Sequence, residues 1–302
     1  MTESERQKAF DREQRRLLRA QIDLLRRTQA TVEGLMQEAI ARVNAILAGQ
    51  PSDYQQWQLP QVKAEINRAL EMFRAQADSS ITAAADQAWD GGRALVDGPL
   101  GAAGMHVSGV APLLTQLQLS ALKSFMTDRI RDVSAEAINR INSQLGLVSI
   151  GAQTPFQATK AVAATLGDRS LQRATTIVRT ELGRAFSVAT QARMDEASKS
   201  VGMDKVWRRS GKPHQRIGHA IADGQRVAHD EPFEIVAKTG EIITLMYPRD
   251  PKGPPGETIN CGCVAIPKVR GWNSTTPDRV PFTDRELAGN QQLRAIASKS
   301  KK

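Results

Sequence analysis

The chain has 302 residues, of which 40% are hydrophobic and 4% aromatic, so it has the length of two domains and can bury at least one core. No uninterrupted apolar run approaches about 18 residues and the N-terminal segment is strongly charged, which predicts neither a membrane-spanning helix nor a secretory signal. Cys261 and Cys263 are separated by one residue. That spacing excludes a disulfide-stapled scaffold and predicts two free thiols in a protein made in the cytosol.

The formal net charge of +9 is unevenly distributed, with the excess of lysine and arginine in the C-terminal half. Such charge can serve solubility alone, but it also attracts phosphate backbones without reading their sequence. We therefore predict non-specific contact with double-stranded DNA. The candidate contacts are Lys205, Arg208, Arg209, Lys212, Arg216, Lys299, Lys301 and Lys302.

Residues 1–90 have the pattern of a helical hairpin. Apolar or small residues spaced alternately four and three apart predict a long helix over most of residues 5–48, and a second apolar face predicts a helix packed against it. The apolar stripe of the first helix has the heptad spacing of a coiled-coil seam. This seam can equally pair with another chain, so self-association through the N-terminal heptads stays open. The first set is Leu18, Ile22, Leu25, Val32, Met36, Ala39, Val43 and Ile46; the second is Ile66, Leu70, Phe73, Ala77, Ile81, Ala84 and Ala88.

Residues 91–112 contain six glycines and two prolines. Because glycine opposes stable helix formation, this stretch is predicted to be a linker. A connecting helix is expected at 113–147. Thr154 and Pro155 have the residue types of a helix N-cap and first helical position, and they predict a short helix to about Leu166, with a longer helix after Asp168.

Beyond Gly202 the pattern changes to short β-prone runs separated by turns, with a hairpin turn at 238–240. The runs are 206–207, 233–237, 241–247 and 264–267. The predicted fold class is therefore α+β: a long helical N-terminal region followed by a small mixed α/β C-terminal domain over 150–267, with short strands, and a basic tail over 268–302.

Five short signatures follow one another in this half: RTELGRAF at 179–186, VW at 206–207, RIGHAIADGQRV at 216–227, DEPF at 230–233 and INCGC at 259–263. Each is weak alone, but their order and spacing together are specific. Over roughly residues 150–266 the series resembles the Mu F-like minor head proteins of tailed bacteriophages, also called phage head morphogenesis proteins.

The resemblance implies a non-enzymatic minor capsid protein of the virion, assembled in the bacterial cytoplasm. It implies a place at the portal vertex or in the capsid interior, with portal protein, major capsid protein and packaged DNA as partners and no membrane. The family pattern falls on residues that we expect to hold the shape of the domain. They are Arg179, Thr180, Glu181, Trp207, His219, Asp223, Gly224, Phe233, Asn260, Cys261 and Cys263.

The sequence leaves the role of the cysteines open. Cys261, Cys263 and His219 offer soft and imidazole ligands for zinc, with His229 or His214 as a fourth, although structural zinc sites favour two residues between paired cysteines. The alternative is a domain without a cofactor in which two small buried thiols lie beside His219.

Other functions are compatible with parts of the sequence. One is a coiled-coil scaffolding or DNA-condensing protein. The others are enzymes: a cysteine nucleophile paired with His219, or a metal-dependent nuclease. The nuclease would use His214, His219, Asp223, His229, Asp230 and Glu231.

Overall fold

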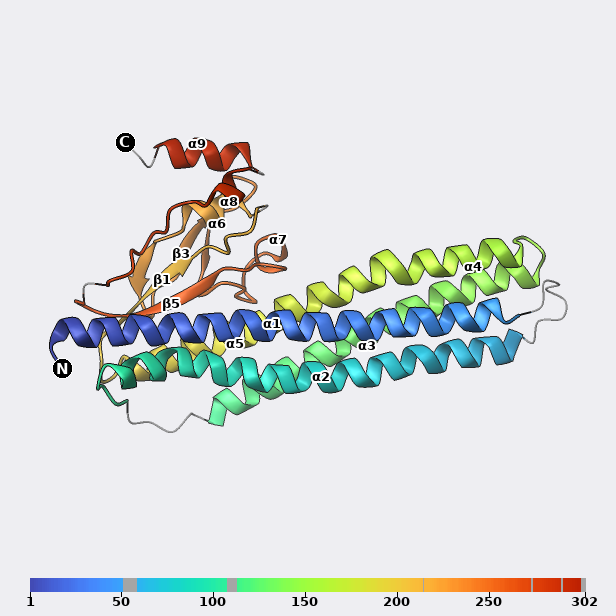
Figure 1. Ribbon diagram of the computed structural model, residues 1–302, viewed down its shortest axis with the longest axis horizontal. Helices are drawn as coiled ribbons and strands as arrows, with labels where there is room; N and C mark the ends of the chain where they lie inside the picture. Colours follow the sequence, from blue (N-terminus) through green and yellow to red (C-terminus); the bar gives the residue numbers. More distant parts are fainter. Residues whose placement is uncertain (51–58, 108–112, 214, 273, 289, 300–302) are drawn as a thin grey trace. The chain divides into compact units, whose positions relative to one another are not determined.

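The computed structural model describes all residues except 51–58, 108–112, 214, 273, 289 and 300–302 (Figure 1). The N-terminal half is helical: α1 (Glu3–Ala48), α2 (Leu59–Ala102), α3 (Leu113–Ser149), α4 (Pro155–Ala164), a π-helical turn η2 (Thr165–Ser170) and α5 (Leu171–Ala197). Five strands and four short helices follow: β1 (Met203–Arg208), α6 (Ile217–Ile221), β2 (Arg226–Ala228), β3 (Phe233–Val236), β4 (Ile242–Leu245), α7 (Pro255–Thr258), β5 (Val264–Val269), α8 (Asp284–Ala288) and α9 (Gln291–Lys299). The predicted α+β class is confirmed.

The chain forms two compact units, and the long helices contribute to both. The helical unit comprises Leu24–Ala85 and Ser120–Glu181; the mixed unit comprises Met1–Asp23, Asp86–Leu119 and Leu182–Lys302. The units therefore do not follow the predicted division of the chain into consecutive segments. Within the described residues, no helix has the length and apolar character that crossing a membrane would need.

The helical unit has a core of the predicted apolar faces. Val32 and Met36 of α1, Phe73 of α2 and Ile130 of α3 are at most 1% exposed. Thr154 caps α4: its hydroxyl accepts from the backbone N–H of Gln157, whose side chain accepts in return from the backbone N–H of Thr154, as the N-cap prediction required.

The seam predicted on α1 is wrong in its first two turns. Ile22 is 48% exposed, whereas Gln14, Gln21 and Thr28, seven residues apart, are buried. In this part of α1 the buried heptad positions are therefore occupied by polar side chains, not by the apolar residues from which the seam was predicted. The later seam residues Val32, Met36, Ala39 and Val43 are buried within the described chain, and self-association through the heptads stays a prediction.

The linker predicted from residue 91 is also wrong for the residues that lie in α2. The helix continues to Ala102, with Leu95, Val96 and Leu100 at most 1% exposed. A Cβ at Gly92 would lie 2.4 Å from the carbonyl oxygen of Phe186 in α5. Glycine here serves close packing of two helices rather than flexibility. Residues 108–112 of the predicted linker lie outside the described residues.

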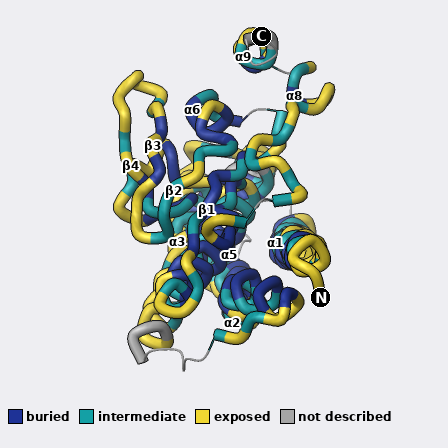
Figure 2. Tube along the Cα trace, turned by 90° about the vertical axis from the view of Figure 1, so that its left-hand side faces the viewer, coloured by how far each residue is buried: buried dark blue, intermediate teal, exposed yellow. Residues whose placement is uncertain are grey.

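The mixed unit contains two small antiparallel sheets, one of order β2-β1-β5 and one formed by β3 and β4. Four of the strands coincide with predicted runs, and β2 was not predicted. The central strand β1 is largely buried and appears mostly dark blue in Figure 2. The turn at 238–240 joins β3 to β4 as predicted, and Gly240 adopts a positive φ of 90°.

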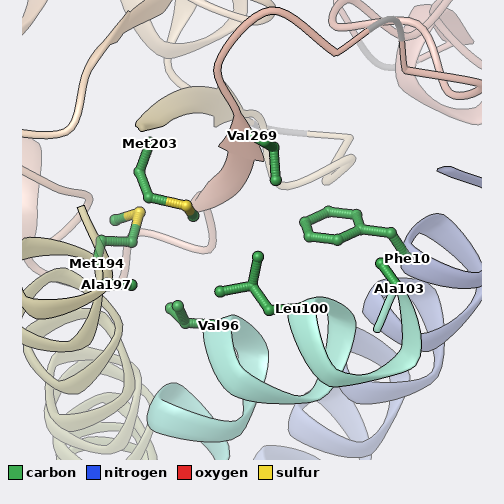
Figure 3. Close-up of a cluster of buried hydrophobic side chains, with 8 residues drawn as sticks. All are labelled: Phe10, Val96, Leu100, Ala103, Met194, Ala197, Met203 and Val269. Atoms are coloured by element: carbon green, nitrogen blue, oxygen red, sulfur yellow. The ribbon is translucent and has the colours of Figure 1, made fainter. Parts of the chain in front are cut away.

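Helices and strands of the mixed unit share a hydrophobic cluster (Figure 3). The buried side chains come from α1, α2 and its C-terminal end, α5, β1 and β5, and Gln14 of α1 adds a 2.8 Å hydrogen bond to the carbonyl of Pro267 in β5. The strands are therefore anchored on the helix ends. The cluster consists of Phe10, Val96, Leu100, Ala103, Met194, Ala197, Met203 and Val269.

The segment 268–302 is packed rather than a free basic tail where the structure describes it. Asp11 of α1 accepts a hydrogen bond of 2.9 Å from the backbone N–H of Thr275, and Leu293 of α9 is fully buried. Glu286 of α8 is 1% exposed. This segment completes the mixed unit.

Candidate functional site

Arg249 lies at the centre of the signature region. It has a positive φ of 70° and is 3% exposed. The guanidinium donates to the carbonyl oxygen of Cys261 at 2.6 Å and to the hydroxyl of Ser187 in α5 at 3.1 Å. A Cβ at Gly183 would lie 2.6 Å from Nε of Arg249, so the glycine of the RTELGRAF helix makes room for this side chain. Arg249 thus connects α5 with the cysteine-containing loop.

His219 of α6 and the two cysteines before β5 converge. Nδ1 of His219 is 3.5 Å from Sγ of Cys261 and 3.5 Å from Sγ of Cys263, and the three atoms lie within 4.8 Å of one another. All three residues are 2% exposed. The predicted grouping of these residues is confirmed, and within the described part of the chain it is the one such group of His, Cys, Asp or Glu that could hold a metal ion.

Local backbone geometry brings the two sulfurs together. Asn260 adopts a positive φ of 56°, a conformation that asparagine tolerates better than most residues. A Cβ at Gly262 would lie 2.8 Å from Cβ of Ser210, so no larger residue fits between the cysteines without a shift. The backbone N–H of Cys263 points to Sγ of Cys261 at 3.5 Å. The single-residue spacing therefore forms a tight turn that faces both thiols toward His219.

The other ring nitrogen of His219, Nε2, lies next to a carboxylate. Nε2 of His219 is 3.1 Å from Oε2 of Glu257 in α7, and Glu257 also accepts a 3.2 Å hydrogen bond from the backbone N–H of Lys238. A pocket of about 240 Å³ opens beside this group. Its lining includes Ser210, Lys212, Gln215, Arg216, Asn260 and Gly262.

The environment separates the two thiols in acidity. The hydrogen bond with Cys263, together with His219 and Arg249, holds the pKa of Cys261 well below its ordinary value against the opposing effect of burial. Burial, followed by the contact with Cys261, raises the pKa of Cys263. Burial also lowers the pKa of Arg249.

A second buried network surrounds Asp223. Arg209 pairs with Asp223 through Nη1 and donates to Oε1 of Glu286 at 2.8 Å, and the side chains of all three are at most 3% exposed. Gly224, with φ of 85°, donates its N–H to the carbonyl of Trp207. The ADGQ signature is thus a turn that binds the start of the C-terminal segment. Burial alone would raise the pKa of Glu286, but hydrogen bonds from Arg209, Thr283 and Gln215 outweigh it and lower this pKa to about 2.

Two predicted DNA contacts are corrected by burial. Lys205 is fully buried, donates to the carbonyl of Met246 at 2.8 Å, and has its pKa lowered to about 8 by burial. Arg209 is used in the ion pairs with Asp223 and Glu286. Lys205 lies two residues before Trp207 on β1, and strand alternation places both on one face, a signal that could have identified Lys205 as interior.

The other predicted contacts have different positions. Arg208 donates to the carbonyls of Pro277 and Asp278, and its side chain is 17% exposed. Lys212 and Arg216 are half-buried at the pocket and stay predictions as DNA contacts. Only the backbone of Lys299 is described, and the predicted contacts Lys301 and Lys302 lie outside the described residues.

The aromatic signatures form a core. Trp207 packs edge-on against His219 and Phe233, with ring centroids 5.3 Å apart in both pairs, and Trp207 and Phe233 are fully buried. In the helical unit, Thr180 and Glu181 are buried, and Arg179 donates to Oε1 of Gln29 at 2.8 Å. These positions agree with a role in holding shape.

The residues considered for a nuclease do not converge among those described. Asp223 is paired with Arg209. Nδ1 of His229 lies 3.0 Å from Oδ1 of Asp195, and His229 is not part of the group formed by His219 and the cysteines. His229 is therefore not a fourth zinc ligand either. Asp230 and Glu231 are exposed. His214 lies outside the described residues.

Sequence reasoning missed three important positions: Arg249, Glu257 and Glu286. Each acts on a partner far away in the chain, so no local spacing marks it. An acid just before the cysteine signature was the available signal for Glu257.

Residues 151–266 match the family model described as Phage Mu protein F like protein. A Bacillus subtilis (strain 168) protein, uncharacterized protein YqbB, is 34% identical over 127 residues, which cover 40% of this chain and 39% of that protein. The NAD(+)–arginine ADP-ribosyltransferase EFV of Enterococcus faecalis (strain ATCC 700802 / V583) is 32% identical over 105 residues, covering 34% of this chain and 20% of that protein. No solved structure matches the chain significantly. The resemblance to the Mu F-like family that the signatures indicated is therefore confirmed over residues 151–266, and the chain spans well under half the length of the two relatives.

Proposed function

We propose that the protein is a minor structural component of a tailed-phage head, present in few copies at the portal vertex or inside the capsid. The observation that carries this proposal is the match of residues 151–266 to the Mu F-like family. The described geometry supports a structural role, because the signature side chains bond to one another in the interior. Trp207, Asp223 and Cys261 are all at most 3% exposed.

The proposed role involves no catalysis. The matched segment covers 20% of the ADP-ribosyltransferase relative, so we assign the shared part to assembly and propose no transferase activity for this chain. The buried network of Arg209, Asp223 and Glu286 supports this, because its charges are paired with one another. Acids and bases held in this way define a fold rather than meet a substrate.

The proposed protein partner is the portal or the major capsid protein. Ile221 of α6, Val236 of β3 and Ile242 of β4 are 46%, 39% and 68% exposed, and all three line a pocket of about 420 Å³ in the mixed unit. Grouped exposed aliphatic side chains are typical of a protein-binding surface. We place the capsid contact there. Packaged DNA would meet cations of the same unit, with the half-buried Lys212 and Arg216 beside the smaller pocket as candidates.

Complementation of a phage that lacks this gene tests the capsid contact. Ile242→Asp should keep the fold and lower incorporation of the protein into particles several-fold, because it places a charge in the proposed contact. Ile22→Asp is the matched control: Ile22 is 48% exposed on α1 of the same unit and is away from the pocket lining. Equal incorporation of both variants would refute the proposed surface.

A further inference from the structure

We propose that His219, Cys261 and Cys263 bind one zinc ion, which joins α6 to the loop before β5. The sequence alone left this choice open against a pair of buried thiols without a metal.

The imidazole nitrogen has the separation from both sulfurs that zinc requires. Ligands 2.0 to 2.3 Å from a tetrahedral zinc lie roughly 3.3 to 3.8 Å from one another, and a nitrogen–sulfur pair lies about 3.5 Å apart. Nδ1 of His219 is 3.5 Å from each sulfur. A disulfide would join the cysteines to each other and leave the imidazole without a role, and residues one apart are poorly placed for that bond. Zinc uses all three side chains.

Glu257 orients the imidazole for this purpose. Its Oε2 lies 3.1 Å from Nε2 of His219 and 3.6 Å from Nε of Arg216, so Nε2 is the ring nitrogen on the carboxylate side and Nδ1 is the one that faces the two sulfurs. In the described structure neither Nε2 nor Oε2 has a partner in hydrogen-bond geometry, and both atoms are buried. Metal ligation at Nδ1 fixes the ring, and the carboxylate–histidine–metal arrangement then satisfies both atoms.

His219, Cys261 and Cys263 all line the pocket of about 240 Å³, so a water molecule from this pocket would supply the fourth ligand. Gln215 lines this pocket, and its Oε1 is buried and has no hydrogen-bond partner among the described residues. It is available to accept a hydrogen bond from that water. Three protein ligands and one water complete a tetrahedral set.

The metal would stabilise a domain with little regular structure of its own. The sheet beside the site has three strands and the other sheet has two. Zinc links two segments that are about forty residues apart, and its binding free energy adds to folding free energy because the unfolded chain has no preformed site.

Cobalt substitution of the full-length chain tests the proposal. The sequence contains two cysteines, so any thiolate-to-metal charge-transfer band reports Cys261 or Cys263. After reduction and removal of metal, Co²⁺ should give that band with the intense visible absorption of tetrahedral coordination, saturate at one ion per chain and be displaced by Zn²⁺. A pale octahedral spectrum without the charge-transfer band would overturn the proposal.

Variants make the test specific. Cys263→Ser should lose stoichiometric metal and part of the charge-transfer band. Glu257→Gln keeps the ligands and should lower zinc affinity about 10- to 100-fold. The control His229→Gln removes a histidine that pairs with Asp195 instead and should bind as the wild type does. If Cys263→Ser does not fold, Glu257→Gln provides the test. A zinc affinity of Glu257→Gln equal to that of His229→Gln would contradict the proposed site. Zinc should also raise the Tm of the wild type, and an unchanged Tm at saturating zinc counts against it.

Discussion

Nη1 of Arg249 donates a 2.6 Å hydrogen bond to the carbonyl oxygen of Cys261, while Nη2 of the same guanidinium reaches Ser187 of α5. The RTELGRAF helix and the cysteine signature are therefore parts of one framework, although they are far apart in the sequence. This contact explains why a glycine stands in the middle of α5.

Gly183→Ala should destabilise the protein by roughly 1–3 kcal/mol, because the new methyl group would overlap the guanidinium of Arg249. In an open helix the same change stabilises by about 0.5–1 kcal/mol. Gly34→Ala in α1 is the control, since a Cβ there meets nothing within 4 Å. Urea unfolding of both variants measures the difference. Stabilisation by both changes would show that Arg249 does not pack on Gly183.

Arg209→Ala should cost about 3–5 kcal/mol, because it leaves the buried carboxylates of Asp223 and Glu286 without their cation. Arg270 is a suitable control: its side chain is 55% exposed and pairs with Asp204 at the surface, so Arg270→Ala should change stability by less than about 1 kcal/mol. Equal losses in chemical denaturation would contradict the buried network.

Acid should unfold the protein partly through Glu286. Its pKa is about 2 in the folded chain, below the ordinary value of 4.5, so the unfolded chain takes up a proton first as pH falls. The stability that Glu286 contributes is complete above about pH 4.5 and is lost between that pH and about 2. Glu286→Gln should be less stable at neutral pH and show a shallower acid dependence. If the free energies of unfolding of the wild type and of Glu286→Gln run parallel between about pH 4.5 and 2, Glu286 is not the group that titrates in this range.

DNA binding should depend on Lys212 and Arg216. Replacing both by glutamine should weaken binding at low salt and reduce the slope of log K against log salt by about one for each DNA phosphate that is no longer neutralised. A matched double variant removes the exposed cations Lys252 and Arg270. If the two double variants have the same slope, the DNA-binding surface does not lie beside the pocket.

The helices and most strands could be predicted because their signals are local. The apolar faces of α2 and α3 repeat along the sequence, and Thr154 precedes Pro155 at the start of α4. The exceptions involved packing partners. The glycines around Gly92 have the composition of a linker, and only the close approach of Phe186 shows that they serve helix packing. Ile22 has the spacing of a seam residue, although its neighbour Gln21 is the buried one.

The site was predictable to a similar extent. The grouping of His219 with Cys261 and Cys263 followed from the signatures, but the role of Glu257 depends on a helix that brings distant residues together. Charge was the least reliable guide. Lys205 and Arg209 contribute to the basic composition, yet both are buried and bonded inside the domain.

The most direct test of the virion role is quantitative mass spectrometry of purified, DNA-filled particles of the phage that encodes this chain. We predict a fixed ratio of a few copies per particle relative to the major capsid protein, retained through density-gradient purification. Presence in empty precursor heads with absence from DNA-filled particles would identify a scaffolding protein instead, and absence from both would contradict the account.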